Sequence, residues 1–262
     1  MTKTVTMAPR EGNPPPRLWE LPAGLMNSIG LPNKGLSRFL DEDLAELAAL
    51  SVPLIVNVMG FSREEVAELV REISERETVD ALELNVSCPN VKTGLVMGAD
   101  PPELEALLRL VRPLTEKPLI VKLSPNAGDV VAVARAAEEA GADALSLINT
   151  LRGMALRPGT AEPWLGAGTG GVSGPGVRPM ALAQVAAVAD AVDIPVVGMG
   201  GVACGQDALD LLRVGARLVA VGTESFRDPA AGLRISCELA ELLANTEVGL
   251  AANHLSASPG AA

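Results

Sequence analysis

The sequence predicts an α/β fold, a TIM (β/α)8 barrel in which seven of the eight β/α units can be recognised. Short apolar runs alternate with helical stretches along the 262 residues, as parallel strands and their connecting helices do. The runs are nearly all apolar, which is typical of strands buried on both faces. An open doubly wound sheet shows the same alternation. Here, however, polar and glycine-rich residues directly follow one run after another, and barrels build active sites from those loops.

Each expected strand precedes an expected helix. Strands are expected at residues 2–5, 54–58, 81–86, 119–123, 144–148, 195–199 and 218–221. Helices are expected near residues 41–50, 62–76, 101–112, 129–140, 179–191, 205–214 and 228–244. Ser62 and Glu65 have capping-box spacing, and Gly141 and Gly215 stand where a helix must end. A closed barrel needs eight units, so one unit is absent or the count of seven is wrong.

The composition limits the classes of partner and location. Hydrophobic residues make up 48% of the chain and aromatic residues 2%, so the core must be aliphatic. The formal net charge of −11 would repel nucleic acids and anionic membrane surfaces. No apolar run reaches the roughly 18 residues that span a bilayer, and the first residues lack a signal peptide's apolar stretch. A cytoplasmic protein is expected, with one domain at residues 1–255 and a disordered tail at 256–262.

Polar residues gather in the loops after the expected strands. Amides such as Asn85 and Asn149 pair a donor with an acceptor, which matches the imide edge of a pyrimidine or flavin ring. Lys122 lies in an apolar strand, where an unpaired charge would be costly, so a function is favoured. The late glycine-rich loops offer backbone N–H groups to a phosphate. Taken singly, a Gly-Gly pair is usually only a turn and an Asn often only a cap, but together these features fit FMN.

Cys88 is the candidate for proton transfer. It follows a buried strand and lies in a loop beside Pro89. A thiol with an ordinary pKa of about 8.5 could remove a proton from an acidic C–H group near neutral pH. A nucleophile, or no role at all, are the alternatives. His254 is the only histidine and lies near the tail, so no histidine is available for a Ser-His or Cys-His mechanism.

Several segments, taken in order, resemble the class 1 dihydroorotate dehydrogenases from residue 2 to about residue 227. They are TKT (2–4), REGNPPPR (10–17), NSIGLPNKG (27–35), NVSCPNVK (85–92), IVKLSP (120–125), NTLRGM (149–154), GGVSGP (170–175), GMGGV (198–202) and AVGTESF (220–226). NVSCPN together with NTLRGM is highly specific for this family, whereas GMGGV alone is not.

The resemblance implies oxidation of dihydroorotate to orotate in de novo synthesis of UMP. Cys88 would take the C5 proton while C6 passes a hydride to FMN, and Lys122 would stabilise charge on the reduced flavin. The implied FMN contacts are Lys3, Thr4, Asn57, Asn85, Lys122, Ile148, Gly174, Gly200, Gly201, Gly222 and Thr223. The implied substrate contacts are Lys3, Asn27, Ser28, Ile29, Gly30, Leu31, Asn85, Asn149 and Thr150, with Asn90 as a weaker candidate.

The motifs also imply a partner. NTLRGM and NVSCPNVK look more like the NAD-linked class 1B enzymes than the fumarate-linked class 1A homodimers. That subclass implies a heterotetramer built on a homodimer of the catalytic chain, with an iron–sulfur/FAD electron-transfer subunit and NAD⁺ as final acceptor. The sequence has no four-cysteine cluster motif, so the cluster would lie on that subunit.

One departure from the family implies that the first β/α unit of the barrel is missing, and two alternatives to the family's activity stay open. Family members begin with a further strand and helix, whereas here Met1 stands directly before the TKT segment. The alternatives are an inactive or unstable truncated fragment, and a reductase of a related pyrimidine base.

Overall fold

The computed structural model describes residues 1–87 and 97–256, with side chains described up to residue 245. Its main sheet is parallel and six-stranded, in the order β10-β9-β6-β5-β4-β3. The strands are β3 (Ile55–Val58), β4 (Ala81–Asn85), β5 (Leu119–Lys122), β6 (Ala144–Leu147), β9 (Val196–Met199) and β10 (Leu218–Ala220). All six lie within expected strands, so the α/β prediction is confirmed, and the sheet with its helices forms part of a TIM barrel.

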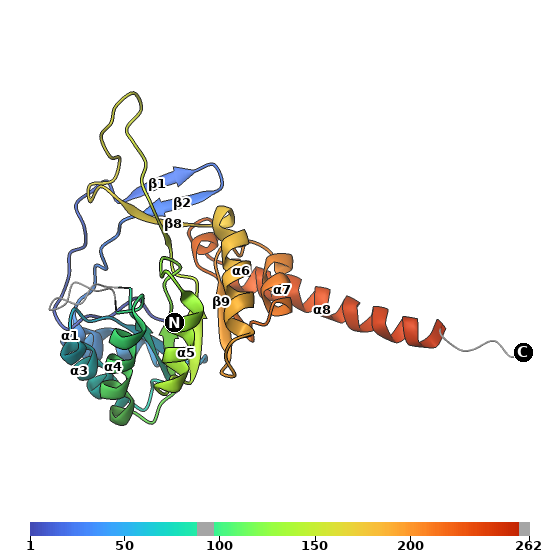
Figure 1. Ribbon diagram of the computed structural model, residues 1–262, viewed down its shortest axis with the longest axis horizontal. Coiled ribbons are helices and arrows are strands. Elements are labelled where there is room, and N and C mark those ends of the chain that lie inside the picture. Colours follow the sequence, from blue (N-terminus) through green and yellow to red (C-terminus); the bar gives the residue numbers. More distant parts are fainter. Residues whose placement is uncertain (88–96, 257–262) are drawn as a thin grey trace, which may run out of the picture.

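The helices connect these strands and lie outside the sheet (Figure 1). They are α3 (Arg63–Ser74), α4 (Pro101–Val111), α5 (Val130–Glu139), α6 (Arg178–Ala189), α7 (Gly205–Arg213) and α8 (Ala231–Ser256), with the short turns η2 (Arg112–Leu114), η3 (Pro175–Val177) and η4 (Thr223–Phe226). Their apolar faces pack on the sheet in one aliphatic core, in which Leu69, Leu108 and Leu145 are fully buried. This packing fixes where each strand ends, and therefore where the loops after the strands lie.

The expected strand at residues 2–5 forms only in part. Val5 makes a parallel bridge with Val58. Two backbone bonds tie the segment to β3, from Thr2 N to the Ile55 carbonyl and from Val5 N to the Asn57 carbonyl, both at 2.9 Å. The segment therefore extends the parallel sheet beyond β3. Among the described residues, β10 at the opposite end is hydrogen-bonded on one side only, to β9, so these strands do not close into a ring.

A second sheet was not expected from the sequence. It is four-stranded and antiparallel, in the order β1-β2-β8-β7, and lies at the top of the view in Figure 1. Its strands are β1 (Leu18–Leu21), β2 (Gly24–Asn27), β7 (Leu151–Gly153) and β8 (Gly170–Ser173). The strands have four residues at most, and β8 contains two glycines, so neither length nor composition marks them as strands. Residues interpreted as loops are thus held in a sheet.

Two helical regions differ from expectation. The expected helix at 41–50 begins earlier, as consecutive turns α1 (Leu36–Arg38), η1 (Phe39–Asp43, a π-helical turn) and α2 (Leu44–Leu47). Gly35, with φ +81°, precedes the first turn. The expected helix at 228–244 is α8, which continues to Ser256 and so includes the first residue of the expected tail. Residues 257–262 lie outside the described residues, and the domain boundary at 255 stays a prediction.

The capping and helix-ending signals in the sequence were more accurate than the expected bounds of these two helices. Ser62 caps α3 by accepting a hydrogen bond from the Glu65 N–H at 3.2 Å. The Glu65 carboxylate accepts from the Phe61 N–H at 2.8 Å. Gly141 and Gly215 have positive φ and follow α5 and α7, as glycines that end helices do. In the part of the chain that the structure describes, no helix combines the length and apolar character that a membrane crossing requires.

Candidate active site

A large cavity of about 1160 Å³ lies between the carboxyl ends of the parallel strands and the antiparallel sheet. Loops after β3, β4, β5, β6, β9 and β10 line it from one side, and β2 and β8 line it from the other. The strand-end loops meet here because parallel strands carry their carboxyl ends to the same edge. The cavity is therefore the place where the predicted loop residues can act together.

Most predicted site residues line this cavity. They are Lys3, Asn27, Ile29, Gly30, Leu31, Asn85, Lys122, Ile148, Asn149, Thr150, Gly174, Gly200, Gly201, Gly222 and Thr223. Thr4, Ser28 and Asn57 are buried nearby but do not line it. Cys88 and Asn90 lie outside the described residues. The structure thus brings most of the predicted set together, while the binding role of each residue stays a prediction.

An amide cluster forms one wall. Asn149 donates through Nδ2 to Ser87 Oγ at 2.7 Å and to Asn85 Oδ1 at 3.4 Å. Its Oδ1 accepts from the Thr150 N–H at 2.8 Å. Asn126 donates to the Thr150 carbonyl at 3.0 Å. These bonds fix the orientation of the amides at the end of β4 and after β6, both of which line the cavity.

The 27–31 loop is shaped by the segment before β1. Asn13 donates from its backbone N–H to the Ile29 carbonyl at 3.0 Å and from Nδ2 to Ser28 Oγ at 2.7 Å. A Cβ on Gly30, which has φ +77°, would lie 2.3 Å from the Asn13 backbone nitrogen. Leu31 also has positive φ, which is uncommon for a non-glycine residue. The Ser28 side chain serves this loop rather than the cavity.

Glycines open the opposite wall. Gly200 and Gly201 have φ values of +124° and +78°, which favour glycine. Gly222 differs, because its φ is −115° and a Cβ there would have no neighbour within 4 Å. Packing does not require Gly222, which lines the cavity and has open space where a side chain would stand. Thr223 follows it and donates to Ser173 Oγ at 2.8 Å.

Lys122 has a buried acidic neighbour that sequence reasoning missed. Its ammonium lies 3.7 Å from Glu83 Oε1, and the Glu83 side chain is fully buried in β4. Asn57 donates through Nδ2 to Oε1 at 2.5 Å, and Ser146 donates through Oγ to Oε2 at 2.7 Å. Asn57, predicted as a cofactor contact, therefore also holds Glu83. A glutamate inside the apolar run ALELN was the signal that could have identified Glu83.

Lys3 also lines the cavity. It belongs to the segment at residues 2–5, which pairs with β3 through the bridge between Val5 and Val58. Burial lowers the pKa of its ammonium, because desolvation disfavours the charged form. A negatively charged ligand beside it would offset that cost. The remaining lining residues missed by the sequence reasoning include Ser87, Ser124 and Asn126, which lie in the same strand-end loops as the predicted residues.

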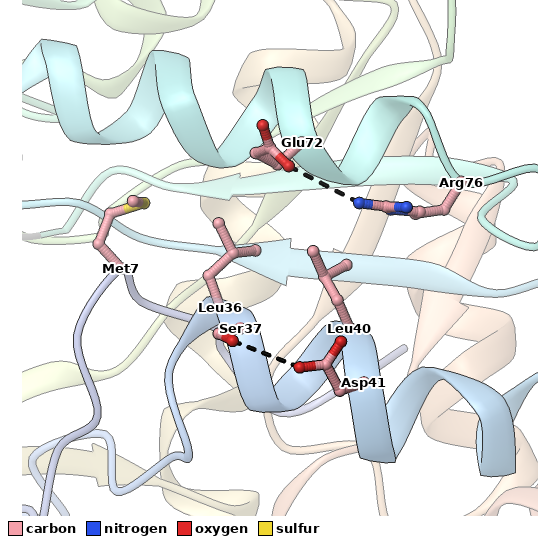
Figure 2. Close-up of a pocket in the computed structure, with 7 residues that line it drawn as sticks. All are labelled: Met7, Leu36, Ser37, Leu40, Asp41, Glu72 and Arg76. Carbon is pink, nitrogen blue, oxygen red and sulfur yellow. Dashed lines mark hydrogen bonds and ion pairs between the residues drawn. The ribbon is translucent and has the colours of Figure 1, made fainter.

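A second hollow, of about 390 Å³, lies between α1, η1 and α3 (Figure 2). Figure 2 shows that its polar side chains pair with one another: Glu72 with Arg76 at 3.7 Å, and Ser37 with Asp41 at 3.4 Å. Of the predicted site residues that the structure describes, none lines it. Among the residues that the structure describes, no group of His, Cys, Asp and Glu could hold a metal ion. The large cavity is therefore the candidate active site.

Comparisons with known proteins show the family to which the chain belongs. The model of the dihydroorotate dehydrogenase family matches residues 1–243. A Geobacillus sp. (strain WCH70) protein, "Dihydroorotate dehydrogenase B (NAD(+)), catalytic subunit", is 46% identical over 261 residues, covering 99% of this chain and 82% of that protein. A Citrifermentans bemidjiense protein of the same description is 44% identical over 249 residues, covering 95% and 82%.

A solved structure shows the same fold. The crystal structure of DHODH from Eimeria tenella, in complex with ferulenol, matches with a TM-score of 0.76. The match covers 94% of this chain and 74% of that one, at 23% sequence identity. At this identity the likeness concerns the fold alone.

Proposed function

Because the chain belongs to the dihydroorotate dehydrogenase family, we propose that it oxidises dihydroorotate to orotate in pyrimidine biosynthesis, with FMN as its flavin. One observation supports this most: predicted residues from Lys3 to Thr223, far apart in the sequence, line a single cavity. Amides, lysines and glycines in one cavity match a planar cofactor with a phosphate and an anionic ring substrate.

The cavity fits FMN and a substrate together. Ligand pockets commonly measure about 300–1,000 Å³, and this one measures about 1160 Å³. The free space at Gly222 and the turn at Gly200 and Gly201 would leave backbone N–H groups open to the phosphate. Lys122 would lie against the isoalloxazine ring. When bound, FMN supplies the acceptor for the hydride that leaves C6 of dihydroorotate.

The amide cluster would orient the substrate. Asn85 and Asn149 are held by each other and by Ser87, so a pyrimidine ring that bonds to them takes one orientation. Lys3 and the 27–31 loop would hold the carboxylate from the other side. Alignment of both reacting C–H bonds before reaction contributes directly to the rate.

Cys88 would be the base that removes the C5 proton. It directly follows Ser87, which lines the cavity. The C5 proton would pass to the Cys88 thiolate, which becomes a thiol, and the electron pair of the C5–H bond would form the C5–C6 double bond as the hydride leaves C6. Orotate would be the product, and FMN, when bound, would supply the acceptor for the two electrons.

We further propose that these electrons reach NAD⁺ through a partner subunit carrying FAD and an iron–sulfur cluster, in a heterotetramer built on a homodimer of this chain. The relatives' description, "catalytic subunit", supports a complex with another chain.

The test is a turnover assay with two acceptors. The FMN-loaded protein alone should convert dihydroorotate to orotate with an artificial dye as acceptor, but should not reduce NAD⁺. Addition of an iron–sulfur flavoprotein subunit from a class 1B enzyme should confer NAD⁺ reduction. Turnover of another pyrimidine base in place of dihydroorotate, or a protein that binds no flavin, would contradict the proposal. Rapid NAD⁺ or fumarate reduction by the chain alone would contradict the class 1B assignment.

A further inference from the structure

Glu83 is a buried acid without direct access to the cavity. Its side chain has no exposed surface, and it does not line the cavity that Lys122 lines. Taking a carboxylate out of water costs several kcal/mol unless partners compensate. An apolar residue at this position of β4 would avoid that cost, as its neighbours Leu82 and Leu84 do. A buried carboxylate here therefore needs a reason beyond packing.

Three other strands of the parallel sheet supply the partners that the structure describes for Glu83. Asn57 from β3 and Ser146 from β6 each donate to one carboxylate oxygen, at 2.5 Å and 2.7 Å. Lys122 from β5 approaches Oε1 at 3.7 Å. Both hydrogen-bond donors are themselves buried, so the carboxylate is fixed in place. Lys122 is the one partner that reaches the cavity, with 19% of its side chain exposed.

We propose that Glu83 is a positioning residue. It holds the Lys122 ammonium from the side away from the cavity, so that the positive charge of Lys122 faces the flavin. The proposal rests on the proposed function, because it assigns Lys122 to the flavin. Lysine is a flexible side chain with a mobile point charge. A fixed anion 3.7 Å away restricts that charge to one place in the cavity wall, and preorganised charge is what stabilises a developing negative charge.

Glu83→Gln isolates this role. A glutamine has nearly the same shape: its Oε1 can still accept from Asn57, and its Nε2 can donate to Ser146 Oγ. Only the negative charge facing Lys122 is lost. Glu103→Gln is the matched control, because Glu103 is also largely buried, lies 3.5 Å from Arg63 in an ion pair, and does not line the cavity.

The readout is the sulfite affinity and midpoint potential of FMN in the loaded protein, since both rise with positive charge beside the ring. Lys122→Met should weaken sulfite binding by about tenfold or more and lower the potential. Glu83→Gln should shift both quantities in the same direction, even though it removes a negative charge. In the Lys122→Met background, Glu83→Gln should have no further effect, and Glu103→Gln should have none in either background.

The opposite sign overturns the proposal. If Glu83→Gln tightens sulfite binding or raises the potential, Glu83 acts only as a distant anion. If it lowers the melting temperature and flavin content equally in both backgrounds, with unchanged sulfite affinity, its role is structural. Failure of the wild-type protein to bind FMN overturns both proposals. Bound FMN that dihydroorotate cannot reduce overturns the proposed reaction alone, because the sulfite measurement does not involve dihydroorotate.

Discussion

Lys3 gives the site a pH dependence with a definite sign. Burial lowers its pKa, so the free protein loses this charge at a lower pH than an exposed lysine would. An anionic ligand favours the charged form, and binding therefore takes up a proton near that pH. The affinity for orotate should be constant at lower pH and fall as the pH rises through the lowered pKa of Lys3.

Absorbance titrations of orotate between pH values of about 7 and 10 measure this dependence. Lys3→Arg is the control, because an arginine stays charged throughout this range. Titration of the ligand itself affects both proteins equally. If the two proteins lose affinity in parallel, Lys3 does not contact the carboxylate.

Cys88 carries the prediction about the base. Cys88→Ala should retain FMN and orotate binding but lose turnover by about 10²- to 10⁴-fold at neutral pH, the usual contribution of a general base. Cys88→Ser should recover part of the activity at high pH, since a hydroxyl is a much weaker acid. Cys204→Ala is the control, because Cys204 stands at the start of α7 and does not line the cavity. Equal losses in the two alanine variants would remove Cys88 from the mechanism.

At the level of single residues, the sequence identified site residues by their positions at strand ends. It did not identify which of these residues contact buried neighbours. Asn85, Lys122, Asn149 and Gly222 each follow or end a strand, and all line the cavity. Asn57 occupies a similar position, yet its side chain points to Glu83. Which interior residues meet depends on the register of β3 against β4, where Asn57 pairs with Glu83, and a single sequence does not specify this register.

Among the elements, the late glycine-rich loops contain one glycine that the fold requires and one that it does not require. Gly201 has φ +78°, and a Cβ there would lie 2.7 Å from the Arg178 Cβ. Gly222 has neither restriction. Gly222→Ala should therefore leave the melting temperature unchanged but weaken FMN binding by about tenfold, because the new methyl group projects into the cavity.

Gly201→Ala should instead destabilise the fold by more than about 1 kcal/mol as well as weaken FMN binding. Thermal unfolding of both apo proteins, with fluorescence titration of FMN, measures the two effects. A Gly222→Ala variant that binds FMN normally would show that the phosphate or ring does not approach this loop.

The strands of the parallel sheet and the helices that pack on it could be predicted from the sequence because their signals are local. Buried runs such as LIVK at Leu119–Lys122 and the capping box at Ser62 need no knowledge of distant residues. The antiparallel sheet could not, since β2 pairs with β8 across more than a hundred residues of chain. Its strands are short and glycine-containing, and only their tertiary pairing makes them strands.

In the whole molecule, the two sheets form different walls of the cavity. The parallel sheet supplies the strand-end residues, including Lys122 and Asn149, and the antiparallel sheet covers them through β2 and β8. The cavity between them is large enough for a cofactor and a substrate together. This cavity is therefore expected to hold a flavin and dihydroorotate in reacting contact.

Anaerobic reduction of the bound flavin by dihydroorotate tests this claim most directly, because it needs neither a partner subunit nor an external acceptor. The protein is loaded with FMN, freed of oxygen and mixed with a small excess of dihydroorotate, and the flavin absorbance is followed with time. Our account predicts rapid loss of the absorbance band of oxidised flavin, with one orotate formed per FMN reduced. A fully FMN-loaded protein whose spectrum is unchanged by dihydroorotate, yet is bleached by dithionite, would contradict it.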